Sequence, residues 1–445
     1  MLMKPKTLRR PINIVWIIME STGTRYAMGE VFKSRPPMPF LQHLAATGWY
    51  LARHRSPSNS SATSIVAQMS GLWPVPSRRM MSVRKDNYLP GLPAFLPGWD
   101  RFLVTPGKLT YFFPRAFMEH NGMDELWGYR QLPSRKVVAK DRLAKDEIET
   151  VGFFLKRLQR AKEPFLGVYY SYMPHWEYTD YGRAWRRYHG PRLIDHYHNG
   201  LWLLDHQLRR IVDGLKAKGV LDRTLVVLVG DHGEAFGQHK KNWAHAKGSW
   251  EENLQTPAIL WAPGLLKPRK ISWQTSHVDL LPTTLDLLNI AYDPYLLQGE
   301  SLLQSKLRRK VSFYWGNEAT VSAIHVDGTK VQLSLTERWC RAYNLKRDPR
   351  ERRRRRCTSP RSKALRKLLR GWVRSQRRLV RAYSKAMQRG ERFGGRRHPS
   401  LSTQAPPTAS DAPARPPGSH RNGAPPPAKP TRVVPPSAAP GQSNG

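Results

Sequence analysis

The chain has 445 residues, a hydrophobic content of 40% and a formal net charge of +41 at pH 7. Its length suits one large α/β domain with additions or two ordinary domains, and no apolar run approaches the length of a membrane-spanning helix. The excess charge, densest after residue 340, favours anionic partners such as acidic lipids, anionic glycans, nucleic acid, or phosphate- and sulfate-bearing substrates.

The N-terminal segment has a basic start followed by a short apolar run, as a signal peptide does. The apolar run Ile14–Met19 is followed at once by Glu20 and lacks a small-residue cleavage site. We therefore interpret residues 11–19 as a buried strand rather than a signal peptide. Without a recognisable export signal or spanning segment, the sequence leaves the location unknown, with a cytoplasmic or membrane-peripheral one as the default.

Strands and helices alternate over the next 250 residues or so. The predicted strands cover 164–173, 224–230 and 256–264, and the predicted helices cover 39–48, 60–71, 140–161, 193–219 and 277–290. This alternation predicts an α/β fold with a large, mostly parallel central sheet covered by helices on both faces. In such folds, ligands bind beyond the carboxyl ends of the strands.

The C-terminal third has a different pattern. Residues 310–345 predict a small antiparallel unit, residues 361–389 a basic amphipathic helix, and the Pro-rich stretch beyond Gly394 a disordered tail. We divide the chain into a catalytic domain (11–300), a small β subdomain (301–356), the basic helix (357–389) and the tail (390–445). The two cysteines, Cys340 and Cys357, have no metal-type spacing and indicate no disulfide framework.

The basic helix suggests a partner. Leu365, Leu369 and Trp372 lie along one stripe, which is typical of a helix that lies on an acidic membrane surface. A solvated basic face is the plainer interpretation. The arginine run 352–356 would also suit nucleic acid, which we consider a less favoured partner.

The stretch TLVVLVGDHGEAFGQH places Asp231 and His232 at the carboxyl end of a buried strand, and Glu20 stands at the same end of the first strand. Two carboxylates and an imidazole suit one divalent ion, with Mn²⁺ or Zn²⁺ favoured over Mg²⁺ or Ca²⁺. The plainer alternative is a helix-capping aspartate beside an ordinary surface histidine.

Hydroxyl groups stand at the start of a predicted helix, where Ser60 and Ser61 precede ATSIVAQM. A helix N-terminus lowers the cost of an alkoxide and of a bound anion, although serine is also the ordinary capping residue there. His175 follows a strand directly, and His245 and Lys247 lie beyond the DHGE stretch. Two imidazoles and a cation would suit a substrate with negatively charged oxygens.

These segments, in this order, resemble the sulfatase-like branch of the alkaline phosphatase superfamily over residues 11–351. The strand NIVWIIMES, the strand and histidine of PFLGVYYSYMPHWEY, and above all TLVVLVGDHGEAFGQH with HAKGSWEENLQTPAIL carry the resemblance. It implies that Ser61 is the nucleophile, with Ser60 or Thr63 as alternatives. It further implies four metal ligands, Glu20, Ser61, Asp231 and His232, and three substrate or leaving-group contacts, His175, His245 and Lys247.

The chain also departs from true sulfatases. Their C/S-x-P-x-R motif is replaced by Ser61-Ala-Thr-Ser-Ile65, so we do not expect conversion to formylglycine, and Glu20 is followed by Ser21 instead of a second acid. These features look more like the phosphoglycerol and phosphoethanolamine transferases, which resemble lipoteichoic acid synthase. The resemblance thus implies a metal-dependent hydrolase or transferase that acts on a phosphate ester or phosphodiester through a phosphoserine-type intermediate. A sulfuric ester hydrolase is the first alternative, and a catalytically degenerate protein that binds anionic polymers is the second.

Overall fold

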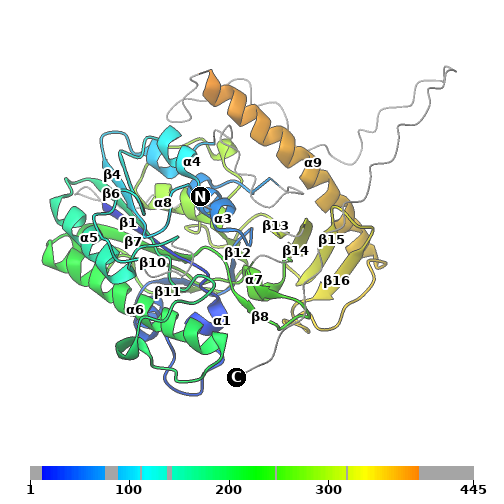
Figure 1. The fold of residues 1–445 in the computed structure, drawn as a ribbon. Helices are drawn as coiled ribbons and strands as arrows, with labels where there is room; N and C mark the ends of the chain where they lie inside the picture. The colour runs from blue at the N-terminus through cyan, green and yellow to red at the C-terminus, as the bar shows by residue number, and fades with distance from the viewer. Residues whose placement is uncertain are drawn as a thin grey trace, which may run out of the picture. The chain divides into compact units, whose positions relative to one another are not determined.

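The computed structural model describes residues 13–75, 89–110, 113–137, 143–245, 248–316 and 319–389. The predictions made for residues 11–12, for Lys247 and for the tail from residue 390 lie outside these residues. Described elements are labelled as in Figure 1.

An eight-stranded sheet forms the centre of the fold, in the order β11–β2–β10–β7–β1–β6–β4–β5 (Figure 1). Its strands are β1 (Asn13–Met19), β2 (Trp49–Leu51), β4 (Asp100–Val104), β5 (Glu125–Trp127), β6 (Phe165–Tyr170), β7 (Thr224–Gly230), β10 (Ala258–Trp261) and β11 (Arg269–Ile271). All paired strands are parallel except β10, which is antiparallel to both β7 and β2. The prediction of a mostly parallel sheet is confirmed.

Helices cover both faces of this sheet. Residues of α2 (Pro39–Thr47), α5 (Glu147–Arg160) and α6 (Leu193–Ala217) share one core with Val15, Ile17 and Met19 of β1. Residues of α3 (Ser61–Ser70), α4 (Arg115–His120) and α8 (Leu280–Leu287) pack against Ile14, Trp16 and Ile18 on the opposite face. Because alternate residues of β1 point to opposite faces and both faces are covered, the strand has to be apolar throughout.

Short elements connect these layers. Two helices of four residues, α1 (Thr24–Ala27) and α7 (Glu251–Leu254), follow β1 and precede β10, and two small strand pairs join β3 (His54–Arg55) with β12 (Thr275–Ser276) and β8 (Ala235–Phe236) with β9 (Trp243–Ala244). The predicted helix over 140–161 begins only at Glu147, because the Asp146 side chain caps it by accepting the backbone N–H of Glu149 at 3.0 Å.

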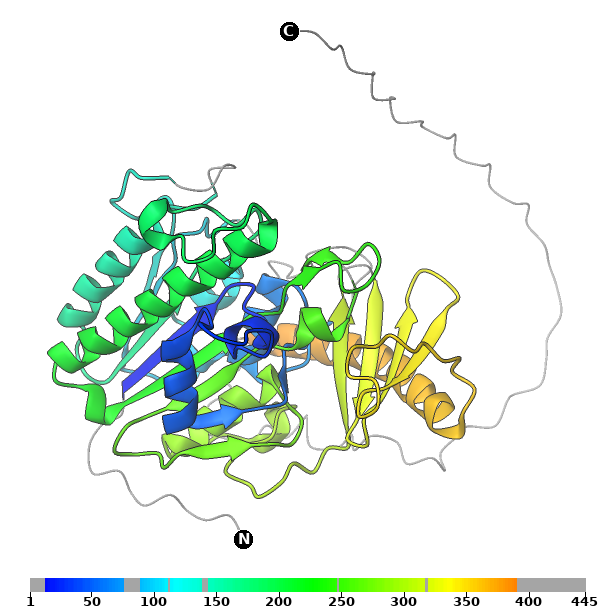
Figure 2. The same ribbon diagram turned by 90° about the horizontal axis from the view of Figure 1, so that it is seen from below.

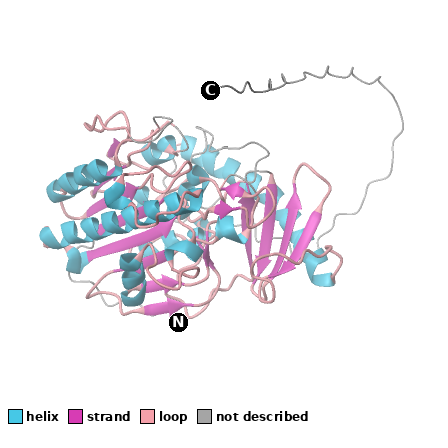
Figure 3. Cartoon of the chain, turned by 60° about the horizontal axis from the view of Figure 1, so that its bottom comes forward, coloured by secondary structure: helices cyan, strands magenta, loops and turns pink. Residues whose placement is uncertain are grey.

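A second, antiparallel sheet follows, with β13 (Val311–Gly316), β14 (Thr320–His325), β15 (Thr329–Ser334) and β16 (Cys340–Asn344) in chain order (Figure 3). This sheet confirms the predicted antiparallel unit. The expectation that the cysteines indicate no disulfide is wrong, because Cys340 and Cys357 are bonded to each other. Their separation of 17 residues does not by itself indicate a disulfide. The two cysteines meet because the chain returns to the start of β16.

The long helix α9 (Pro360–Gln388) packs on the second sheet (Figure 2). The predicted membrane contact through its apolar stripe is wrong, because Leu365, Leu369 and Trp372 are only 3%, 0% and 7% exposed. Trp372 stacks on Phe313 of β13 with ring centroids 4.7 Å apart. The apolar side of α9 is therefore used inside the protein. In the part of the chain that the structure describes, no helix is long and apolar enough to cross a bilayer.

Candidate active site

Strand register brings two carboxylates together. Met19 of β1 pairs with Gly230 of the parallel neighbour β7, so the next residues, Glu20 and Asp231, leave the sheet side by side. The Asp231 backbone N–H donates to the Met19 carbonyl at 3.0 Å, which continues the ladder one residue beyond the strands. The predicted meeting of these side chains at the carboxyl edge of the sheet is what the structure shows.

Small residues allow the chain to turn at this edge. A Cβ atom on Gly230 would collide with the Thr256 side chain, and one on Gly233 would collide with the Glu252 carbonyl oxygen. Any side chain at either position would displace the Asp-His pair that lies between them. After β1 the turn is made by Ser21, whose φ of 48° is uncommon for a residue with a side chain.

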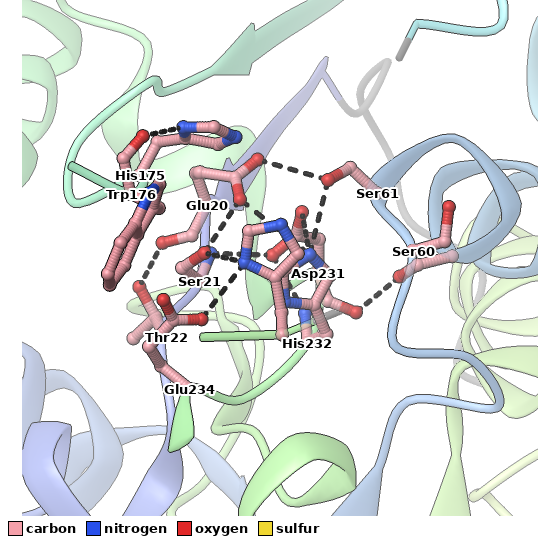
Figure 4. Close-up of polar contacts among 12 residues, drawn as sticks. Glu20, Ser21, Thr22, Ser60, Ser61, His175, Trp176, Asp231, His232 and Glu234 are labelled. Atoms are coloured by element: carbon pink, nitrogen blue, oxygen red, sulfur yellow. Dashed lines mark hydrogen bonds and ion pairs between the residues drawn. The ribbon is translucent and has the colours of Figure 1, made fainter. Parts of the chain in front are cut away.

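Ser61 is the hydroxyl that faces this cluster. It is the first residue of α3, and its Oγ lies 3.1 Å from His232 Nε2 and 3.3 Å from Glu20 Oε2. Ser60 is the residue before the helix, and its buried Oγ has no hydrogen-bond partner among the described residues. Figure 4 shows Ser61 turned toward Glu20 and His232, with Ser60 on the far side. Of the two neighbouring serines, Ser61 is the one whose hydroxyl contacts the cluster.

The cluster has the donors that a divalent cation needs. His232 Nε2 lies 3.6 Å from Glu20 Oε1 and 3.4 Å from Asp231 Oδ2. Donor atoms of Glu20, His232 and His245 lie within 4.8 Å of one another. His245, expected to contact substrate, is thus also placed where a metal ligand could stand. Carboxylate, imidazole and hydroxyl donors in this number fit Zn²⁺ or Mn²⁺.

Because these donor groups are buried, placing charge on them costs free energy. Burial and the neighbouring Glu20 carboxylate raise the pKa of Asp231 well above its usual value, since two adjacent buried carboxylates cannot both ionise cheaply. Burial also opposes ionisation of Glu20, but the surrounding imidazoles outweigh it and lower its pKa to about 2. Burial, together with the nearby His245 ring, lowers the pKa of His232 to about 3, which leaves that imidazole neutral and able to bind a metal. A bound cation would balance both carboxylates.

Two further histidines border the cluster. The His245 ring lies 4.5 Å from the His232 ring and 5.4 Å from the His175 ring, measured between centroids. His245 Nδ1 lies 3.0 Å from Glu234 Oε2, and although burial opposes protonation, this carboxylate raises the pKa of His245. Glu234 belongs to the DHGE stretch but was given no role from sequence; here it orients His245.

The side chain of Glu147, the first residue of α5, is hydrogen-bonded to the loop that carries His175. Its Oε2 accepts the backbone N–H groups of Tyr172 and Met173 at 3.0 and 3.3 Å, and the Tyr169 hydroxyl donates to Oε1 at 2.6 Å. Burial raises the pKa of Glu147 to about 7 despite these donors. No sequence pattern indicated this role, because an acid in the first turn of a helix is ordinary.

A pocket lies beside Ser61 and borders the cluster at Glu20. It is lined by Glu20, Ser61, Thr105, Gly107, Lys108, Phe113, Leu143, Tyr170, Tyr172 and His175. Lys108 adds a cation that suits a phosphate or sulfate group. Sequence reasoning missed it because residues 72–135 had no interpretable pattern, so nothing predicted that the loop after β4 would border Ser61.

Tyr170, the last residue of β6, contacts both carboxylates. Its hydroxyl donates to Glu20 Oε2 and lies 3.4 Å from Asp231 Oδ2. We expect Tyr170→Phe to bind the metal with about tenfold lower affinity, which is the usual effect of removing a group that orients metal ligands. Metal retention against a chelator checks this. Tyr169→Phe is the matched control, because its hydroxyl contacts Glu147 instead; equal loss in both variants would contradict the prediction.

The central sheet, with a buried acid-and-imidazole cluster at its carboxyl edge, has the fold of a solved protein of the alkaline phosphatase superfamily. The family model named Sulfatase matches residues 12–290, and the chain belongs to the sulfatase family.

Individual relatives share the fold at low sequence identity. The chain is 23% identical to lipoteichoic acid synthase 2 of Bacillus subtilis over 351 residues, covering 73% of this chain and 53% of that protein. It thus spans about half of that relative's length. An alkaline phosphatase superfamily protein from Vibrio parahaemolyticus superposes with a TM-score of 0.67 at 18% identity, covering 88% of this chain and 91% of that one. A lipoteichoic acid synthase from Listeria monocytogenes superposes with a TM-score of 0.63 at 14% identity, covering 85% and 92%.

Proposed function

We propose that this protein hydrolyses or transfers a phosphate ester or phosphodiester, using Ser61 as the nucleophile. The observation that carries the proposal is the position of the Ser61 hydroxyl, 3.1 Å from His232 Nε2 and 3.3 Å from Glu20 Oε2 at the start of α3. A sulfatase that uses formylglycine needs a C/S-x-P-x-R motif, and the Ser61–Ile65 stretch has neither the proline nor the arginine. An unmodified serine therefore favours phosphorus over sulfur chemistry.

In the proposed reaction the Ser61 oxygen attacks phosphorus in line with the leaving oxygen. A bound divalent ion, held by Glu20, Asp231, His232 and Ser61 itself, would lower the pKa of the serine hydroxyl. The new Ser61 O–P bond forms as the bond from phosphorus to the leaving alcohol breaks. A water molecule or an acceptor alcohol then attacks the phosphoserine and releases the serine. Positioning and charge stabilisation account for most of the rate in such transfers.

The remaining polar groups have supporting roles in this proposal. His245, protonated with the help of Glu234, would give its proton to the leaving oxygen. Lys108 and His175 line the pocket and would contact the non-bridging oxygens of the substrate. Lys247 was expected to share that task, and it remains a prediction outside the described residues.

The substrate class we favour is an anionic phosphodiester, lipid-linked or attached to a glycan. Two observations support it: the similarity to lipoteichoic acid synthases and the strong positive charge of the chain. An acceptor alcohol would make the protein a transferase, and water would make it a hydrolase. Both use the same first step at Ser61.

A panel of chromogenic esters tests the function. With Mn²⁺ or Zn²⁺ supplied, we expect the purified protein to turn over an aryl phosphodiester at least about tenfold faster than an aryl sulfate, because active sites discriminate through charge and leaving-group geometry. Preference for the sulfate, together with formylglycine at Ser61 in a mass spectrum, would establish the sulfatase alternative. Metal-free protein that binds anionic polymer and turns over nothing would establish the degenerate one.

A further inference from the structure

A continuous row of cations runs along the outer face of α9. The helix contains no acidic residue from Pro360 to Gln388. Exposed basic side chains recur along it at intervals of three or four residues, at Lys363, Lys367, Arg370, Arg374, Arg377, Arg381 and Lys385. At a rise of 1.5 Å per residue these positions span about 33 Å along one side of the helix. We call these residues the α9 row.

This arrangement is unfavourable within the chain itself. Residues three and four apart on a helix are neighbours, and like charges at those spacings destabilise it. Salt in solution relieves only part of that repulsion. An anionic partner along the row would relieve the rest.

The opposite side of the helix determines which way the row faces. Val373 packs with the second sheet, while Val380 and Tyr383 join the core of the first. The Gln376 amide donates to the Trp73 carbonyl oxygen, and the Tyr383 hydroxyl donates to the Leu296 carbonyl oxygen. Because the middle and the C-terminal half of the helix are held in this way, the cations form a stationary surface rather than a loose arm.

We propose that the α9 row docks the enzyme on the surface of an anionic lipid bilayer by charge alone. The row lies on a convex helix rather than in a groove, and a straight convex ridge can contact a plane along its whole length. Each Lys or Arg held near an anionic bilayer adds to binding. Because the apolar stripe of α9 is buried, docking needs no insertion into the acyl chains, unlike that of an ordinary amphipathic membrane helix.

Nucleic acid fits this surface less well. Single strands are held by aromatic side chains that stack on bases, and the aromatic residues of α9, Trp372 and Tyr383, are buried. Arg and Lys also contact the phosphates and guanine edges of a duplex, but the phosphates wind around the duplex axis, so a straight row follows neither strand. A bilayer surface is a plane that the whole row can meet at once.

Vesicle binding tests the proposal with the full chain and does not depend on the chemistry at Ser61. The first variant replaces Lys367, Arg370, Arg374 and Arg381 with Gln. The control replaces four exposed cations on or next to α5 and α6 with Gln: Lys156, Arg160, Lys162 and Lys216. Both variants lose the same charge, so any difference between them reports position and not net charge.

We expect the wild type to sediment with phosphatidylcholine vesicles only when phosphatidylglycerol is added, and to be released by salt. The row variant should lose at least about tenfold in partition coefficient, while the control variant stays close to the wild type. Circular dichroism confirms that each variant is folded. Equal loss in both variants, or tight salt-sensitive binding to duplex DNA without vesicle binding, would overturn the proposal.

Discussion

Replacing Ser61 with Ala should reduce turnover of an aryl phosphodiester by about 10³-fold or more. A loss of this size is expected when the nucleophile is removed from a set of catalytic residues that act together. The reason is geometric. The hydroxyl lies at the start of α3, 3.1 Å from His232 Nε2, where developing negative charge is stabilised by the free N–H groups of the helix. The expected change is in kcat, because the alanine leaves the pocket walls in place.

The neighbouring serine supplies a matched control for this variant. Ser60→Ala removes an identical group one residue earlier, and that hydroxyl makes no hydrogen bond within the described residues. We expect it to retain nearly full activity. Rapid quenching of the wild type with substrate, followed by peptide mass spectrometry, should place phosphate on Ser61. Undiminished turnover in Ser61→Ala, or phosphate on Ser60 or Thr63 instead, would remove Ser61 from this role.

Strand-based expectations were accurate because the local pattern and the tertiary environment agree. The runs at Ile14–Met19 and Leu225–Gly230 are apolar throughout, which only a strand covered on both faces tolerates, and both are buried in the sheet. Parallel strands necessarily end at the same edge. The proximity of Glu20 to Asp231 therefore follows from two short stretches of sequence that are more than two hundred residues apart.

Side chains placed by loops and by tertiary contact could not be read in the same way. Lys108 and Glu147 reach the neighbourhood of Ser61 and His175 only because β4 and α5 pack beside β6. Tyr170 looked like one more strand residue. Its hydroxyl matters because the last residue of β6 lies beside the end of β1, and the hydroxyl reaches Glu20 and Asp231, which follow β1 and β7.

Helix α9 shows a different limit of sequence reasoning. Its periodicity correctly predicted a helix with one apolar side, but a hydrophobic stripe does not say what covers it. The stripe around Leu369 is covered by the protein's own second sheet and not by lipid. The disulfide between Cys340 and Cys357 is a similar case, because pairing depends on where β16 begins in space.

Removing the metal should both inactivate and destabilise the protein. Glu20 and Asp231 are 1% and 0% exposed, and without a cation their carboxylates repel each other in a poorly solvated site. We expect chelation to abolish turnover and to lower the melting temperature. Adding Mn²⁺ or Zn²⁺ should restore both, since a ligand that binds only the folded state stabilises it. Elemental analysis of the purified protein should find one such ion per chain.

The Asp231→Asn variant separates the effect of the metal on stability from the effect of the Asp231 charge on stability. Asn keeps the oxygen that accepts the N–H groups of Ser21 and His232, at 2.8 and 2.7 Å, but carries no charge. We expect about tenfold or greater loss of metal affinity. The chelated variant should nevertheless melt at or above the temperature of the chelated wild type, because the repulsion with Glu20 is gone. A simple loss of packing would lower both the metal affinity and the melting temperature in chelator. A variant that is less stable in chelator than the wild type would therefore contradict the proposed cation site.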